Sequence, residues 1–179
     1  MNGLNFITKE NILSFLYISV LLAIGRLIPH PPNFTPILAA AIVAPYILNN
    51  RFISLLIPLS AMIIADFFIG FYSGIIWVYG SIFLCGVLSE YSKKFKNYKL
   101  QLGVMSLLSS IIFFVITNFS VWFFGDLYPK TYEGLLLCYT MAIPFFQNTA
   151  ISTLLYTGLF VMTIEFFKNT TFGLHLRKV

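Results

Sequence analysis

The feature that most constrains the fold is a succession of long apolar runs separated by short polar breaks. Because the hydrocarbon core of a bilayer is roughly 30 Å thick, a helix needs about 20 largely apolar residues to cross it. Of the 179 residues, 59% are hydrophobic and 9% are charged, whereas soluble domains average about 25% charged residues. The pattern predicts an all-α polytopic membrane protein in which residues 1–179 form a single transmembrane domain.

Six apolar segments are candidates for spans, which predicts a six-transmembrane-helix bundle. They cover residues 12–28, 36–48, 52–71, 75–90, 100–124 and 148–167. The second segment has about 13 residues, so we expect a helix that is short, tilted or broken. A further apolar stretch, residues 134–146, precedes the last span. We expect it to be an extra short helix, either re-entrant or lying on the membrane surface.

The basic residues indicate how such a bundle would be oriented. With six spans, nine of the eleven fall on one side: Lys9, Arg51, Lys93, Lys94, Lys96, Lys99, Lys168, Arg177 and Lys178. Since cytoplasmic loops carry the excess of Lys and Arg, both termini are expected to be cytoplasmic in a multi-pass protein of the cell (inner) membrane. A separate crossing by residues 134–146 would move the C-terminal cations to the other side. Their position in short loops also argues against nucleic acid as a partner.

Residues 26–36, R-L-I-P-H-P-P-N-F-T-P, form the most distinctive polar segment. It combines Arg26, His30 and Asn33 with four prolines. Proline fixes φ near −65° and restricts the residue before it, so polar groups in this loop are held in place. The loop lies on the side with few basic residues. We therefore expect it to form one wall of a small-molecule pocket that opens outward.

Other polar and aromatic residues fall on the same half of the six-span arrangement. The predicted ligand-binding set is His30, Asn33, Asp66, Tyr72, Trp77, Asn118, Trp122, Gln147 and Asn148. Amides can donate and accept hydrogen bonds, and flat rings supply walls. Alternative readings remain for each group: tryptophans commonly anchor at the membrane interface, and amides commonly join helices. A lone histidine is more often a loop hydrogen-bonding residue than a metal ligand, so no metal or cofactor site is predicted.

Two features admit both a structural and a functional interpretation. Arg26 and Asp66 are charges near membrane depth, where a charged side chain costs about 2.5–3.5 kcal/mol on insertion scales. They would either form a structural ion pair between the first and third helices or orient a polar ligand. Ser19 and Ala23 have the small-xxx-small spacing that allows close helix contact. They would contact either a partner protein or a neighbouring helix of the same chain.

Enzymatic function is not expected from this sequence. It has no H-E-x-x-H motif, no histidine in a span to activate a buried serine, and no P-loop for ATP hydrolysis. A membrane protein with a structural or assembly role and no ligand remains an alternative. An autonomous secondary transporter is another, although no inverted internal repeat is evident.

A series of short motifs gives a resemblance that covers nearly the whole chain. The motifs are the 26–36 loop, Asp66-x-x-x-Gly70, Trp77-Val78-Tyr79, Thr117-Asn118-Phe119 with Trp122, Tyr128-Pro129-Lys130-Thr131, Ile143-Pro144-Phe145-Phe146 and Asn148-Thr149. In this order they resemble an uncharacterised family of bacterial membrane proteins assigned to transport. That family is similar to the substrate-binding S components of energy-coupling-factor (ECF) vitamin transporters.

The resemblance implies a six-helix bundle that captures a vitamin-like metabolite from outside for uptake. It also implies a transmembrane coupling subunit, driven by separate ATPases, as partner of the first helix. Ser19 and Ala23 would then replace the Ala-xxx-Ala contact of S components. Positions matching Gln147, Ser152 and Thr153 often carry Arg, Gly and Asp in that family, which implies a different or less charged ligand here.

Overall fold

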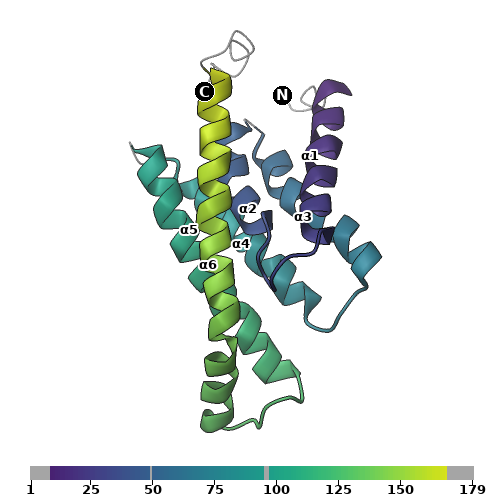
Figure 1. The fold of residues 1–179 in the computed structure, drawn as a ribbon, viewed down its shortest axis with the longest axis vertical. Coiled ribbons are helices and arrows are strands. Elements are labelled where there is room, and N and C mark those ends of the chain that lie inside the picture. The colour runs from purple at the N-terminus through teal and green to yellow at the C-terminus, as the bar shows by residue number, and fades with distance from the viewer. Residues whose placement is uncertain (1–8, 49, 95–96, 169–179) are drawn as a thin grey trace, which may run out of the picture.

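The computed structural model describes residues 9–48, 50–94 and 97–168, and within these ranges the chain is entirely helical outside its turns. Six helices follow one another: α1 (Lys9–Leu27), α2 (Ile37–Ile47), α3 (Arg51–Ile69), α4 (Ile75–Ser92), α5 (Tyr98–Phe124) and α6 (Tyr132–Lys168). The first residue of α1 and the last of α6 lie at the same end of the bundle (Figure 1). The loop between α1 and α2 therefore belongs to the opposite end.

The short second helix occupies the centre of the bundle. α2 has 11 residues, of which Ile37 to Pro45 are all buried, and it packs against α3, α4, α5 and α6. Its composition explains this position, because four alanines let the surrounding helices approach closely. The expected short helix is thus present. Pro45 does not break it, and the chain leaves the helix through a hydrogen bond from Leu48 N–H to the carbonyl of Ala44.

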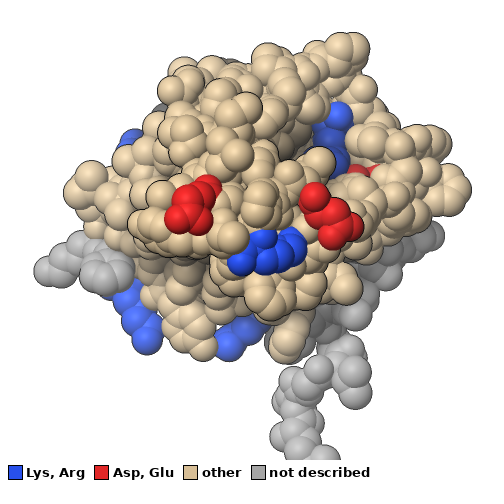
Figure 2. Space-filling model, turned by 90° about the horizontal axis from the view of Figure 1, so that it is seen from below, with Lys and Arg blue, Asp and Glu red and all other residues tan. Residues whose placement is uncertain are grey.

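Four of the described helices, α3, α4, α5 and α6, are long and apolar enough to cross a membrane. The apolar parts of α1 (Phe15–Leu27) and α2 are shorter. Arg51, Lys93, Lys94 and Lys99 lie at the end of the bundle where α1 begins at Lys9 and α6 ends at Lys168. Figure 2 views the opposite end, which is largely uncharged. Lys96, Arg177 and Lys178 lie outside the described residues.

The predicted extra short helix before the last span is wrong. Residues 134–146 are part of α6, one continuous helix of 37 residues that contains Pro144. A proline is tolerated in an apolar helix because neighbouring groups compensate for the lost hydrogen bond. The polar pair Gln147–Asn148, interpreted as a break, lies on the helix instead. Residues 134–146 therefore do not form a separate segment that could cross a membrane on its own.

The N-terminal part of α6 reaches beyond the α1–α2 loop. Asn148 donates a hydrogen bond to the carbonyl of Pro32 in that loop, and Lys168 ends the helix at the other face. At 1.5 Å per residue these positions are about 30 Å apart, which is about one hydrocarbon thickness. The preceding residues of α6, with the end of α5, form a hairpin that projects past the other helices (Figure 1).

The turn of this hairpin requires glycine at position 134. A Cβ there would collide with the carbonyl oxygen of Pro129. We expect Gly134→Ala to lower the free energy of unfolding by about 1–3 kcal/mol, because a backbone group cannot move aside as a side chain can. Thermal unfolding of the purified protein in detergent measures this.

The matched control is Gly103→Ala in α5, where an added Cβ meets nothing within 4 Å. That variant should be neutral or more stable by about 0.5–1 kcal/mol, since alanine favours the helix. Equal stability of the two variants would contradict the close approach at Pro129.

Candidate functional site

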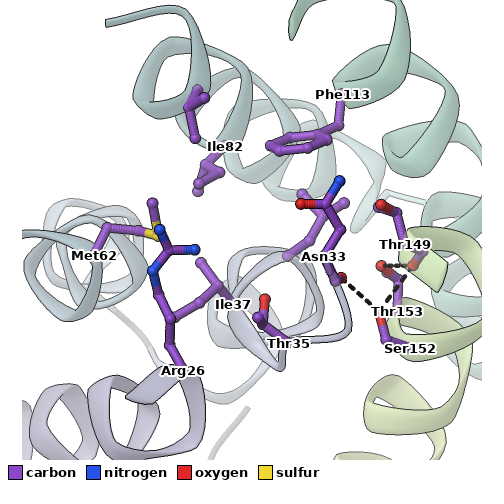
Figure 3. A pocket seen from close by; sticks show the side chains of 12 residues that line it. Arg26, Asn33, Thr35, Ile37, Met62, Ile82, Phe113, Thr149, Ser152 and Thr153 are labelled. Carbon is purple, nitrogen blue, oxygen red and sulfur yellow. Dashed lines mark hydrogen bonds between the residues drawn. The ribbon is translucent and has the colours of Figure 1, made fainter. Parts of the chain in front are cut away.

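A cavity of about 320 Å³ lies at the loop end of the bundle, and a smaller one of about 40 Å³ borders several of the same side chains. The shared lining residues are Arg26, Asn33, Val78, Phe113 and Thr149. The larger cavity adds Tyr72, Phe114, Thr117, Asn118, Val121, Phe145 and Phe146. The smaller adds Thr35, Ile37, Leu38, Met62, Ile82, Ser152 and Thr153 (Figure 3). Small-molecule pockets occupy roughly 300–1,000 Å³, so the larger cavity is at the lower end of that range.

A buried ion pair closes the side of the cavity formed by α1 and α3. Arg26 lies in the last turn of α1, and its Nη2 is 2.8 Å from Oδ1 of Asp66 in α3. Asp66 is completely buried and also accepts a hydrogen bond of 2.9 Å from the Tyr79 hydroxyl of α4. The predicted ion pair is therefore present. Of its two members, only Arg26 lines the cavity, because Asp66 lies behind it.

The proline loop presents Asn33 to the cavity. Asn33 has φ of 62°, a left-handed conformation that few residues other than glycine adopt and that asparagine tolerates best. The loop is held on α6 by the bond from Asn148 to Pro32 and by one from the Ser152 hydroxyl to the Asn33 carbonyl, 3.4 Å. Figure 3 shows the Asn33 amide beside Phe113, with the Arg26 guanidinium approaching the same gap from another side. The loop thus works as a rigid support for one amide.

Polar side chains of α5 and α6 complete the lining. Thr117, Asn118 and Thr149 each donate a hydrogen bond to the carbonyl four residues earlier on their own helix. These bonds use the hydroxyl hydrogens of the two threonines and one of the two amide hydrogens of Asn118, so the Asn118 Oδ1, its second N–H and the hydroxyl lone pairs remain available. The aromatic walls are Phe113, Phe114, Phe145 and Phe146.

The sequence analysis did not single out these phenylalanines as site residues. A signal was available, because Phe113, Phe114 and Phe145 each precede a lining polar residue by four positions and so share its helix face. Arg26, expected either to pair with Asp66 or to orient a polar ligand, forms the pair and also lines the cavity.

Three residues of the predicted ligand set line the larger cavity: Asn33, Tyr72 and Asn118. Tyr72 belongs to the turn between α3 and α4. Burial raises the pKa of its phenol, and the negative charge of Asp66 raises it further. The hydroxyl therefore stays protonated at neutral pH and can act as a donor.

The remaining six residues of the set do not line the cavity. Asp66 is behind Arg26, and Asn148 fixes the loop. The ring nitrogens of His30 lie 2.8 Å and 2.9 Å from the carbonyl oxygens of Pro31 and Arg26, so His30 braces the loop. Gln147 is exposed on α6 outside the cavity.

The two tryptophans make contacts with residues of the projecting α5–α6 hairpin. Trp77 stacks on Phe124 with ring centroids 5.3 Å apart, and the Trp122 Nε1 donates a hydrogen bond of 2.9 Å to the Pro129 carbonyl. Neither tryptophan lines either cavity, and their role as ligand contacts stays a prediction.

Ser19 and Ala23, the predicted partner contact, are buried inside the bundle, 0% and 1% exposed. The Ser19 and Ser60 hydroxyls are 2.7 Å apart and join α1 to α3. Packing within the chain therefore accounts for the small-residue spacing. A partner meeting this bundle would find neither side chain exposed.

Comparison with known proteins gives one match. A model of a family of unknown function (DUF6580) matches residues 6–174, nearly the whole chain. No curated protein and no solved structure shows significant similarity.

Proposed function

The chain belongs to this DUF6580 family of unknown function, and we propose that it is a membrane-embedded substrate-binding subunit for uptake of a small metabolite. The observation that carries the proposal is the cavity of about 320 Å³ at the loop end, where a guanidinium, two amides and several aromatic rings converge. Pockets that combine apolar walls with a few fixed polar groups are typical of small-molecule sites.

The orientation in the membrane follows from the helix ends. We place the end with Lys9, Arg51, Lys93, Lys94, Lys99 and Lys168 in the cytoplasm, because positive residues are retained there. All six helices then traverse the bilayer of the cell (inner) membrane, with α2 short, and the cavity faces outward. A ligand would enter from outside.

The sequence has no P-loop with which to hydrolyse ATP itself. We propose a transmembrane coupling subunit with separate ATPases as the partner. The contact surface would be the exposed apolar face of α1, with Leu16, Tyr17 and Val20, instead of Ser19 and Ala23.

The rival function is structural, and one observation favours it. Asp66, Asn148 and Trp122 of the predicted set form hydrogen bonds within the chain. Asn33 separates the two functions, because its exposed side chain lines the cavity and its backbone alone explains its place in the loop. Removing the amide while keeping the backbone therefore tests binding apart from stability.

We expect Asn33→Gly to lower ligand affinity about 10-fold or more without loss of stability. Glycine adopts the left-handed conformation freely, so the backbone is preserved while the amide is removed. Thermal unfolding and equilibrium binding of the stabilising metabolite measure the two effects separately. Asn33→Ala is the control that removes the amide and also strains the backbone. Unchanged affinity in both variants would favour the structural function.

A further inference from the structure

The Arg26 guanidinium has an unsatisfied donor at the wall of the cavity. Its Nη2 is bound to Asp66, but its Nε is buried and has no hydrogen-bond partner among the described residues. Buried polar groups without a partner are rare in folded proteins, and each one needs an explanation. Arg26 lines both cavities, so a bound molecule can reach the accessible part of its guanidinium, and a small shift of this group would bring Nε to the same acceptor.

The charges around the cavity favour a negatively charged acceptor. Arg26 is the only charged residue among those that line the two cavities. Its counter-ion, Asp66, is fully buried behind it and is already shared with the Tyr79 hydroxyl. No carboxylate lines either cavity to repel an anion. The planar guanidinium fork matches the two oxygens of a carboxylate better than it matches a single carbonyl.

The walls favour a flat molecule. Phe113, Phe114 and Phe146 line the larger cavity, and the rings of Phe114 and Phe146 are 5.0 Å apart at 50°. Aromatic rings pack well against the faces or edges of other flat rings. Asn33 and the Asn118 Oδ1 then offer hydrogen bonds to polar atoms on the ring.

We infer that the ligand is a small aromatic or heteroaromatic carboxylate, with its carboxylate on Arg26 and its ring against the phenylalanines of α5 and α6 that line the cavity. This inference rests on the proposed function, since it names the substrate class of the same cavity. It gives Arg26 two acceptors, Asp66 on one side and the ligand on the other.

The test uses purified full-length protein in detergent and pairs of compounds that differ only in charge. The acids are 2-naphthoate, quinoline-2-carboxylate and indole-3-acetate, each compared with its amide, and 2-naphthyl phosphate is added to separate carboxylate from phosphate. Thermal unfolding and calorimetry should show stabilisation by at least one acid, with its amide binding at least about 10-fold more weakly. The phosphate should not bind more tightly than the matching acid.

Arg26→Lys provides the second arm, because lysine keeps the charge opposite Asp66 but lacks the fork and the Nε donor. The affinity of the acid for this variant should be at least about 10-fold lower than for the wild-type protein, while the affinity of its amide should change little. If the variant does not fold, the comparison of acid and amide binding to the wild-type protein still tests the inference.

Each contrary outcome has a distinct meaning. Equal binding of acid and amide, or tighter binding of the phosphate, overturns the carboxylate assignment and leaves the proposed binding function in place. Failure of every acid, while a broad screen of metabolites finds another ligand, also overturns only the carboxylate. If neither the acids nor any metabolite of the broad screen binds, the inference and the proposed function are both overturned.

Discussion

Replacement of Asp66 by alanine is expected to lower the free energy of unfolding by about 3 kcal/mol, the largest stability effect of the predictions made for this bundle. The variant leaves the Arg26 guanidinium, 21% exposed, without its counter-ion and removes the acceptor of the Tyr79 hydroxyl. Removing one partner of a buried pair costs more than the pair itself contributes, because the other charge remains buried. Thermal unfolding in detergent measures the effect.

Two controls make this prediction specific. Glu90→Gln removes one partner of the Glu90–Lys93 pair. Its N–O distance of 2.9 Å is similar to that of the Arg26–Asp66 pair, but its side chains are 25% and 31% exposed. Its cost should stay within about 1 kcal/mol, as for other accessible pairs. The double variant Arg26→Met with Asp66→Ala should recover part of the lost stability. An Asp66→Ala variant no less stable than Glu90→Gln would contradict the role given to the buried pair.

Filling the cavity is expected to abolish ligand binding. Val121 lines the larger cavity and is 39% exposed, so Val121→Trp places a large ring in the cavity without overpacking the core. We expect an affinity loss of at least about 100-fold, which corresponds to roughly 2.7 kcal/mol. The stability of the unliganded protein should change little.

Val104→Trp is the matched control for this variant. Val104 is on the same helix and 50% exposed but lines neither cavity. It should bind the ligand with wild-type affinity. Loss of binding in both variants, or in neither, would contradict the assignment of the cavity as the ligand site.

The helical architecture could be predicted from the apolar runs, because each run must satisfy its backbone hydrogen bonds internally in a membrane. The exception was α6. Gln147 and Asn148 are polar residues between two apolar stretches, and they were interpreted as a break. The structure shows that Asn148 uses its polarity against the α1–α2 loop. Nothing local in the sequence separates a polar residue that ends a helix from one that holds a distant loop.

The site was predictable in part, and the limits have a physical cause. Asn33 and Asn118 could be found because amides are uncommon in apolar surroundings. Which of Arg26 and Asp66 faces the cavity could not be predicted, because both charges were expected at the same depth. Only the packing of the helices decides it. The resemblance to the uncharacterised membrane-protein family also implied a different or less charged ligand from Gln147, Ser152 and Thr153. Ser152 and Thr153 do line the smaller cavity, but Gln147 does not.

The most direct test of the central claim is thermal unfolding of the purified wild-type protein against a library of vitamins, their precursors and related acids. A molecule that binds the native state stabilises it by about 2.7 kcal/mol at a concentration 100 times its Kd. We predict that at least one compound raises Tm in a saturable way, and that Val121→Trp loses this rise while Val104→Trp keeps it. A Tm that no compound raises, or a rise that Val121→Trp retains in full, would contradict the claim that this bundle binds a small molecule in its outer cavity.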